Sequence, residues 1–122
     1  MPADLYLRST FRTLKPDEPE RDRFIDPYDK YGLFKLIGLS WQRDVLPVLD
    51  KRDCLPVDEA KKLRDRLEGM DITQAMIAEW HRSAGLNRPP EEWLCHFQSQ
   101  RNSLVDLLSR SIEINEPLQC HL

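Results

Sequence analysis

The sequence predicts a mainly α-helical protein, an irregular bundle of four to five helices with a long C-terminal helix. In several segments apolar residues recur with the 3.6-residue period of an α-helix. Glycine or proline stands at most boundaries between these segments, as expected where helices end. The chain has 122 residues, the size of one domain, so we expect a single domain over residues 1–122.

The two ends of the chain are the expected location of extended structure. Residues 4–9 alternate weakly, with Leu5 and Leu7 on one side, which indicates a short strand. A short tail, residues 118–122, follows Pro117. We expect this tail to pair with the N-terminal strand as a two-stranded ribbon.

Residues 10–27 are expected to form a charged, proline-containing loop or arm. From Lys15 to Asp26, eight of twelve residues are charged. Prolines at 16, 19 and 27 disfavour a helix or a central strand there. Within that charged stretch, Phe24 and Ile25 are the only apolar anchors.

Two helices are expected in the next quarter of the chain. Asp26 is a good N-cap, Pro27 suits the first helical position and Gly38 suits the C-terminus, which predicts a buried helix over residues 26–38. Ser40 can cap a second helix that reaches about residue 51. Pro47 should kink or break this helix.

Three further helices are expected after Pro56. The first covers residues 57–68 and ends at Gly69, with a narrow apolar stripe typical of a surface helix. The next begins near residue 71 or 72 and ends before Gly85; its expected buried face is Ile72, Met76 and Trp80, and its expected outward face includes Gln74, Ile77, His81 and Arg82. The last and longest covers residues 90–114; its apolar arc contains Trp93, Leu94, Phe97, Leu104, Leu107, Leu108 and Ile112.

Composition excludes several classes of protein. The chain is 40% apolar and 32% charged, with 18 basic and 21 acidic residues and a net charge of −3. This balance gives no general attraction to nucleic acid or to an anionic membrane surface, and no apolar run is long enough to span a bilayer. The three cysteines are far apart, which suits reduced thiols in the cytoplasm.

Two Cys–His dipeptides, at residues 95–96 and 120–121, raise the question of a metal site. Sulfur and imidazole nitrogen are the ligands of tetrahedral zinc, so His96, Cys120 and His121 are candidate ligands of a metal- or small-ligand-binding domain. Their spacing is unlike that of known zinc sites, in which ligand pairs are separated by two to five residues. The ordinary alternative is a reduced thiol beside a surface histidine. No cofactor is expected.

Catalytic motifs do not assemble in the sequence. Residues 38–42 begin like a nucleophile elbow but lack its last glycine, and Ser40 as a helix cap explains them better. No P-loop, dinucleotide fingerprint, zinc-protease or calcium-loop pattern occurs. The sequence therefore leans away from an enzyme.

A DNA-binding regulator is a further alternative. The helices of residues 57–68 and 72–84 have the outline of a helix-turn-helix, although an ordinary helical hairpin is the commoner structure. Residues 57–88 hold six basic and six acidic side chains, whereas a DNA reader needs a surplus of positive charge. A nucleic-acid partner is therefore not expected.

Three residues are candidates for contact with a protein partner. Phe24 and Ile25 in the charged arm can fold onto a partner, or else pack on the protein's own core. Arg101 lies inside the apolar arc of the last helix, where a guanidinium needs a carboxylate or several carbonyls. It forms either a pocket for an anionic group or a structural contact.

The leading functional hypothesis is a small non-catalytic protein that binds another protein, such as an adaptor, an inhibitor or an immunity-type factor. It depends on the charged arm with its apolar anchors and on the missing catalytic motif. The apolar arc of the last helix is also wide enough to serve a homodimer.

Overall fold

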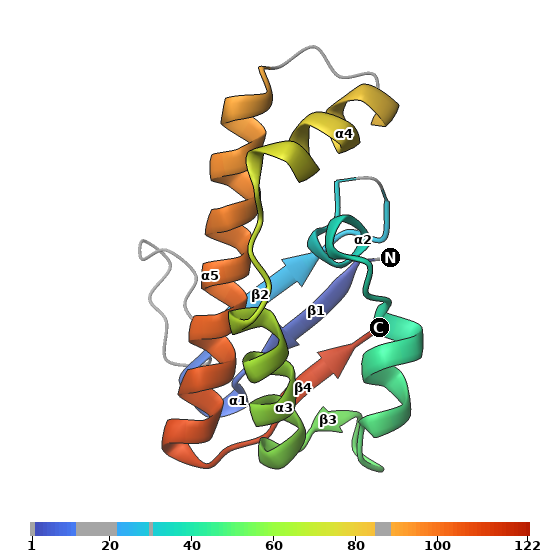
Figure 1. Ribbon diagram of the computed structural model, residues 1–122. Helices are drawn as coiled ribbons and strands as arrows, with labels where there is room; N and C mark the ends of the chain where they lie inside the picture. Colours follow the sequence, from blue (N-terminus) through green and yellow to red (C-terminus); the bar gives the residue numbers. More distant parts are fainter. Residues whose placement is uncertain (1, 12–21, 30, 85–88) are drawn as a thin grey trace.

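The computed structural model describes residues 2–11, 22–29, 31–84 and 89–122, whose path is shown in Figure 1. The elements follow one another as β1 (Ala3–Tyr6), α1 (Arg8–Phe11), β2 (Arg23–Asp26), α2 (Leu33–Ile37), η1 (Trp41–Val45), η2 (Leu46–Val48), β3 (Cys54–Leu55), α3 (Val57–Glu68), α4 (Gln74–Ala84), α5 (Pro90–Ile114) and β4 (Leu118–His121). Of these, η1 is a π-helical turn and η2 a 3-10 turn.

The described strands form one four-stranded antiparallel sheet in the order β2-β1-β4-β3. The protein is therefore mixed α/β, and the expectation of a mainly α bundle is wrong. The strands have only two to four residues each, so none is long enough to show a clear alternating pattern in the sequence. Each is stabilised by pairing with a segment far away in the chain.

The predicted pairing of the two chain ends is present, as the central pair of this larger sheet. Leu5 of β1 lies opposite Cys120 of β4, and Asp4 lies opposite His121. On its other side, β1 pairs with β2, where Leu5 lies opposite Phe24. The strand β3 pairs with the outer side of β4.

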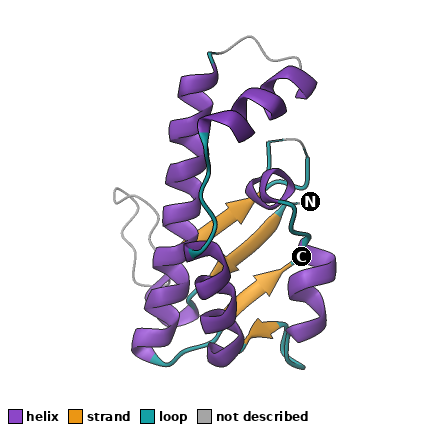
Figure 2. Cartoon of the chain, in the orientation of Figure 1, coloured by secondary structure: helices purple, strands orange, loops and turns teal. Residues whose placement is uncertain are grey.

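One face of the sheet is covered by helices (Figure 2). Because successive side chains of a strand point to opposite faces, the sheet contributes one side of each strand to the core. These inward residues are Ala3, Leu5, Phe24, Asp26, Leu55, Leu118 and Cys120, and all are buried. The opposite face is polar: Arg23 pairs with Asp4 at 2.9 Å, and Tyr6 Oη lies 3.1 Å from His121 Nε2.

The helix α5 is the common packing partner of the other long helices. The helices α3 and α4 both pack against α5, one beside its C-terminal half and the other beside its N-terminal half (Figure 1). They follow each other along α5 and do not pack on each other. The helical hairpin expected for residues 57–84, and the helix-turn-helix considered as its alternative, are therefore not formed.

The helix expected over residues 26–38 is largely replaced by other structure. Asp26 ends β2, and helical structure is confined to α2, Leu33–Ile37. The capping chemistry expected of Asp26 is nevertheless present, because its carboxylate accepts from the amides of Leu33 at 2.7 Å and Phe34 at 3.2 Å. The side chain caps a helix that begins seven residues later.

The helix α4 begins at Gln74, two to three residues later than expected, and shows a different face to the core. Ile77, expected to point outward, is fully buried, whereas Met76 and Trp80 are half-buried. Trp80 contacts Phe97 of α5 edge to face, with ring centroids 5.0 Å apart.

Several local expectations are confirmed. The helices α3 and α5 have the predicted bounds, and Gly38 ends α2 with φ +80°. The hydroxyl of Ser40 accepts from the amide of Arg43, and the helical structure it caps breaks into η1 and η2 just before Pro47, which lies within η2. Of the expected arm over residues 10–27, residues 23–26 form β2, and residues 12–21 lie outside the described part of the chain.

None of the described helices combines the length and the apolar character that crossing a membrane requires.

Candidate functional site

A cleft opens between β2 and the N-terminal half of α5. Its volume is about 340 Å³, within the range of known ligand sites. Ile25, Asp26 and Pro27 form one wall and Trp93, His96 and Gln100 form the other, with Tyr31 completing the lining. The cleft brings together Ile25, a predicted partner-contact residue, and His96, a candidate metal ligand.

Asp26 holds the strand side of the cleft in place. Besides the two amides of α2, its carboxylate accepts a hydrogen bond from the indole Nε1 of Trp41 at 2.7 Å. Burial raises the pKa of Asp26, and these three hydrogen bonds oppose the rise. One buried carboxylate thus fixes the end of β2, the start of α2 and the Trp41 ring relative to one another.

The ring of Trp41 in turn fixes α2. It stacks on Phe34 with centroids 3.7 Å apart and an interplanar angle of 4°, and both side chains are buried. Gly32, just before α2, packs directly against the carbonyl of Pro27. The contact of Gly32 with Pro27 and the stacking of Phe34 on Trp41 therefore hold α2 against the end of β2.

The helix side of the cleft is a connected aromatic cluster. Tyr31 stacks on Trp93 with centroids 5.7 Å apart. Trp93 contacts Trp80 edge to face at 5.1 Å, and His96 contacts Trp93 edge to face at 5.6 Å. Such rings present a large and rigid apolar surface. The partly buried Trp93 therefore forms a firm wall, with the exposed His96 at its rim.

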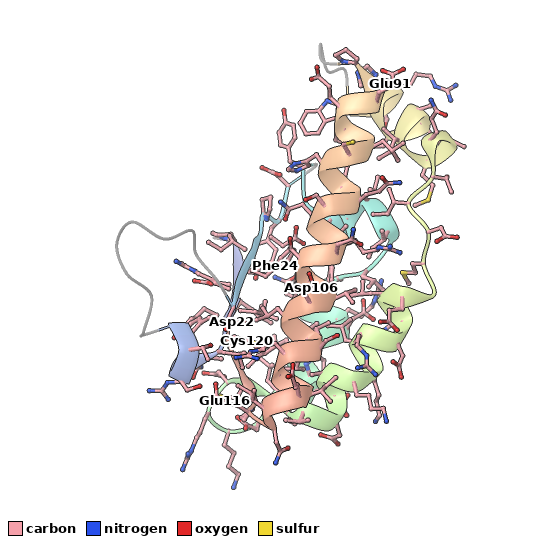
Figure 3. The ribbon with its side chains drawn as sticks, turned by 90° about the vertical axis from the view of Figure 1, so that its left-hand side faces the viewer. Asp22, Phe24, Glu91, Asp106, Glu116 and Cys120 are labelled. Carbon is pink, nitrogen blue, oxygen red and sulfur yellow. The ribbon has the colours of Figure 1, made fainter. Side chains whose placement is uncertain are left out.

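Phe24 and Ile25 have opposite environments although they are adjacent. Phe24 is 3% exposed and lies between β2 and α5 (Figure 3), whereas Ile25 is 41% exposed. The alternation of side chains along a strand separates them. Of the two predicted contact residues, Ile25 is therefore accessible to a partner and Phe24 belongs to the core.

Arg101 lies outside this cleft and makes a structural contact. Its Nη1 donates to the carbonyl of Met70 at 2.6 Å, and its Nη2 donates to Oδ1 of Asn102 at 3.3 Å. Gln98 of the same helix donates to the carbonyl of Ile72 at 3.2 Å. Together these side chains fasten the segment between α3 and α4 to α5.

The candidate metal ligands are not brought together. Cys120 and His121 are neighbours on β4 and point to opposite faces of the sheet, while His96 lies on α5. Burial raises the pKa of Cys120 to about 12, which keeps its thiol protonated at neutral pH. The part of the chain that the structure describes contains no cluster of three or more His, Cys, Asp or Glu side chains suited to a metal ion.

The aromatic wall of the cleft, formed by Trp93 and Tyr31, is not predicted by the sequence. Trp93 has the spacing of a core anchor, and nothing local shows that Tyr31 stacks on it. A tryptophan in the first turns of a helix, close to a chain reversal, is the only signal available.

The three cysteines are all free, as expected of reduced thiols, with Cys95 exposed and the other two buried.

The architecture defines a two-layer α/β class, with helices packed on one face of an antiparallel sheet. Comparison of the chain with family models, curated proteins and solved structures finds no match. The function is therefore inferred from the cleft itself.

Proposed function

We propose that this protein binds another protein, and that the partner docks on β2 and in the cleft beside α5. One observation carries the proposal: Ile25, a large apolar side chain, is exposed on an edge strand of the described sheet and lines an aromatic cleft. An extended segment of the partner, lying along β2, would cover Ile25 and place an apolar side chain against Trp93. The class of function, a protein that binds another protein, is the one expected from the sequence. Of the predicted contact residues, Ile25 is retained, and Tyr31 and Trp93 take the place of Phe24 and Arg101.

Physical chemistry favours this occupant over a metal ion or a polar solute. Aromatic side chains dominate the energetics of protein interfaces because they bury a large area at a low entropy cost. Ile25 is 41% exposed, so covering it contributes roughly 1 kcal/mol, a fraction of the about 1.5–3 kcal/mol gained by burying a fully exposed apolar side chain. A metal ion would find a single imidazole, that of His96, among the cleft residues, together with the carboxylate of Asp26, whose hydrogen bonds are already made.

The chain supplies a matched control for this surface. Leu46 is the other large apolar side chain that is exposed among the described residues, at 48% against 41% for Ile25. It lies on η2, beside the opposite edge of the sheet (Figure 1). A substitution at Leu46 therefore alters the same kind of side chain outside the proposed interface.

The test is site-specific photo-crosslinking with the full chain. A photoreactive phenylalanine analogue replaces Ile25 in one variant and Leu46 in the other, and both are irradiated in lysate of the cells that naturally produce the protein. We expect one discrete covalent adduct with another protein from position 25 and none from position 46. Ile25→Asp in the unlabelled competitor should abolish competition for that adduct, and Leu46→Asp should not.

Two results would contradict the proposal. Equal adduct patterns from both positions would show that the cleft binds proteins no more strongly than the surface around Leu46 does. An adduct of the chain with itself would assign the edge of β2 to a homodimer and remove the separate partner.

A further inference from the structure

A second and larger cavity opens where α1, the turn before β3 and the end of α5 meet. Its volume is about 550 Å³, and it lies at the end of the molecule remote from α4. Arg8 and Ser9 come from α1, Arg52 and Cys54 from the turn and β3, and Glu116 from the segment after α5. Figure 3 shows Glu116 at this end, near α1. None of these residues lines the cleft beside β2.

The carboxylates of this cavity already have donors. Oδ1 of Asp50 accepts from the amide of Arg52 at 2.8 Å and from that of Cys54 at 3.0 Å. Oε2 of Glu116 accepts from the amide of Ser9 at 3.4 Å. Both acidic side chains therefore serve the local backbone, the first by closing the turn and the second by joining α1 to the end of α5.

The guanidinium groups of the same cavity have no such partners. Throughout the described part of the chain, neither Arg8 nor Arg52 forms an ion pair or a side-chain hydrogen bond. Each guanidinium carries five N–H donors and no acceptor. The cavity thus holds two guanidinium groups with unfilled donor capacity beside two carboxylates, Asp50 and Glu116, that are hydrogen-bonded to the backbone. An acceptor-rich oxyanion is the group that complements the free guanidinium donors.

Cys54 lies near both arginines of this cavity, and near the carboxylates of Asp50 and Asp53 as well. The charges of Arg8 and Arg52 both act to lower the pKa of the Cys54 thiol, so both lie close to this residue. Burial and the Asp50 carboxylate outweigh them, and the net effect is a raised pKa. The thiol therefore stays neutral and donates weakly to Oε1 of Gln119 at 3.5 Å.

We propose that this cavity binds a small oxyanion, the carboxylate or phosphate group of a solute, between the guanidinium groups of Arg8 and Arg52. Ser9 adds a hydroxyl donor on the α1 side. The site is separate from the protein-binding cleft and does not depend on it.

The test is an NMR titration of the full-length ¹⁵N-labelled protein at constant ionic strength. Three probes are compared: inorganic phosphate, succinate as a dicarboxylate, and chloride as the reference anion. We expect phosphate or succinate to shift the amide signals of residues 8–9 and 52–54 in a saturable manner, and chloride to leave them in place. Saturation by phosphate alone identifies a phosphate group as the ligand chemistry, and saturation by succinate identifies a carboxylate.

The variants Arg8→Gln and Arg52→Gln each remove one charge from an exposed side chain, so the fold is retained. Each should weaken binding about tenfold, because a hydrogen bond to a charged group is worth roughly that factor or more. The matched control is Arg82→Gln, an exposed arginine on α4, which should bind as the wild type does. The proposal is overturned if phosphate and succinate behave as chloride does, or if the shifts survive in both cavity variants.

Discussion

At the scale of single residues, the buried carboxylate of Asp26 connects β2, α2 and Trp41. It is one of the few buried polar residues in the described chain, at 2% exposure, and its carboxylate accepts from two adjacent amides of α2 and from the indole of Trp41. Burying a carboxylate is costly unless its oxygens are hydrogen-bonded. The donors therefore explain how Asp26 is tolerated in the core, and Asp26 explains why α2 and Trp41 lie where they do.

Replacing Asp26 by Ala should lower the free energy of unfolding by about 2–4 kcal/mol. The change leaves two backbone amides and the Trp41 indole without an acceptor, and each stranded buried donor costs about 1–3 kcal/mol before the structure relaxes. Urea unfolding measures the loss. The control is Asp106→Ala on the exposed side of α5 (Figure 3), which should stay within about 0.5 kcal/mol of the wild type.

Asp26 should also give stability a characteristic dependence on pH. Burial raises its pKa in the folded protein above the ordinary value, so between the two values the folded state holds a proton that the unfolded chain has lost. Linkage then requires the contribution of Asp26 to be greatest below the unfolded pKa, about 3.9, and to fall as pH rises through the folded pKa. We expect the unfolding free energy of the wild type minus that of Asp26→Asn to decrease with pH over this window. An increase would show that the hydrogen bonds outweigh burial and lower the pKa.

At the scale of elements, the short helix α2 depends for its stability on contacts at its two ends and with Trp41. The helix α2 has only five residues, far too few to be stable alone. It exists because Asp26 caps it from β2, because Gly38 ends it with a positive φ, and because Phe34 stacks on Trp41. In contrast, α3 and α5 have 12 and 25 residues, and their own sequences suffice to define them.

The glycines around these helices should differ in their tolerance of alanine. A Cβ at Gly32 would lie 2.1 Å from the carbonyl oxygen of Pro27, so Gly32→Ala should cost about 2–3 kcal/mol through backbone displacement. Gly38 has open space around it but φ +80°, so Gly38→Ala should cost about 1 kcal/mol. Gly69→Ala is the control, because its φ is −81° and its new contacts are ordinary, and it should be neutral or slightly stabilising.

Urea unfolding of the three variants under the same conditions gives this order directly. If Gly32→Ala proved as stable as Gly69→Ala, the close packing of Gly32 on Pro27 would be refuted.

At the scale of the whole molecule, the two ends of the chain close the fold. The central strands are β1 and β4, from opposite ends of the sequence, and each also pairs with an edge strand. Leu118 and Cys120 of β4 lie in the core with Leu5 and Leu7. The sheet therefore cannot be completed until the last residues are in place, which makes folding depend on contacts of very long sequence separation.

Removing residues 118–122 should abolish cooperative folding. The truncation removes the strand between β1 and β3, leaves β3 without a partner in the described sheet, and uncovers the apolar side chains beneath α5. Thermal unfolding followed by near-ultraviolet circular dichroism should show no sharp transition. The control removes only Leu122, which lies beyond β4 and packs on the core as a partly buried side chain; the transition should stay cooperative and fall by only a few degrees. A truncated chain that still melts cooperatively near the same temperature would show that β4 is dispensable.

The candidate site was only half predictable from the sequence. The adjacent apolar pair Phe24 and Ile25 stands out in a charged stretch, and that much is readable. Which of the two faces outward depends on the register of β2 against β1, in which Phe24 lies opposite Leu5. The sequence also predicts that Arg101 needs an acceptor, whereas the identity of that acceptor, the Met70 carbonyl, depends on how α4 is reached from α3.

What the sequence by itself determined is the set of features that short-range physics controls: the bounds of α3 and α5, the Ser40 cap, the Gly38 terminus and the break at Pro47. Each depends on interactions within about one helical turn, so its signal is local. The sheet, the cleft between β2 and α5 and the arginine cavity were decided only by the tertiary structure. They join segments separated by up to the length of the chain, and no local pattern encodes which distant strands and side chains will meet.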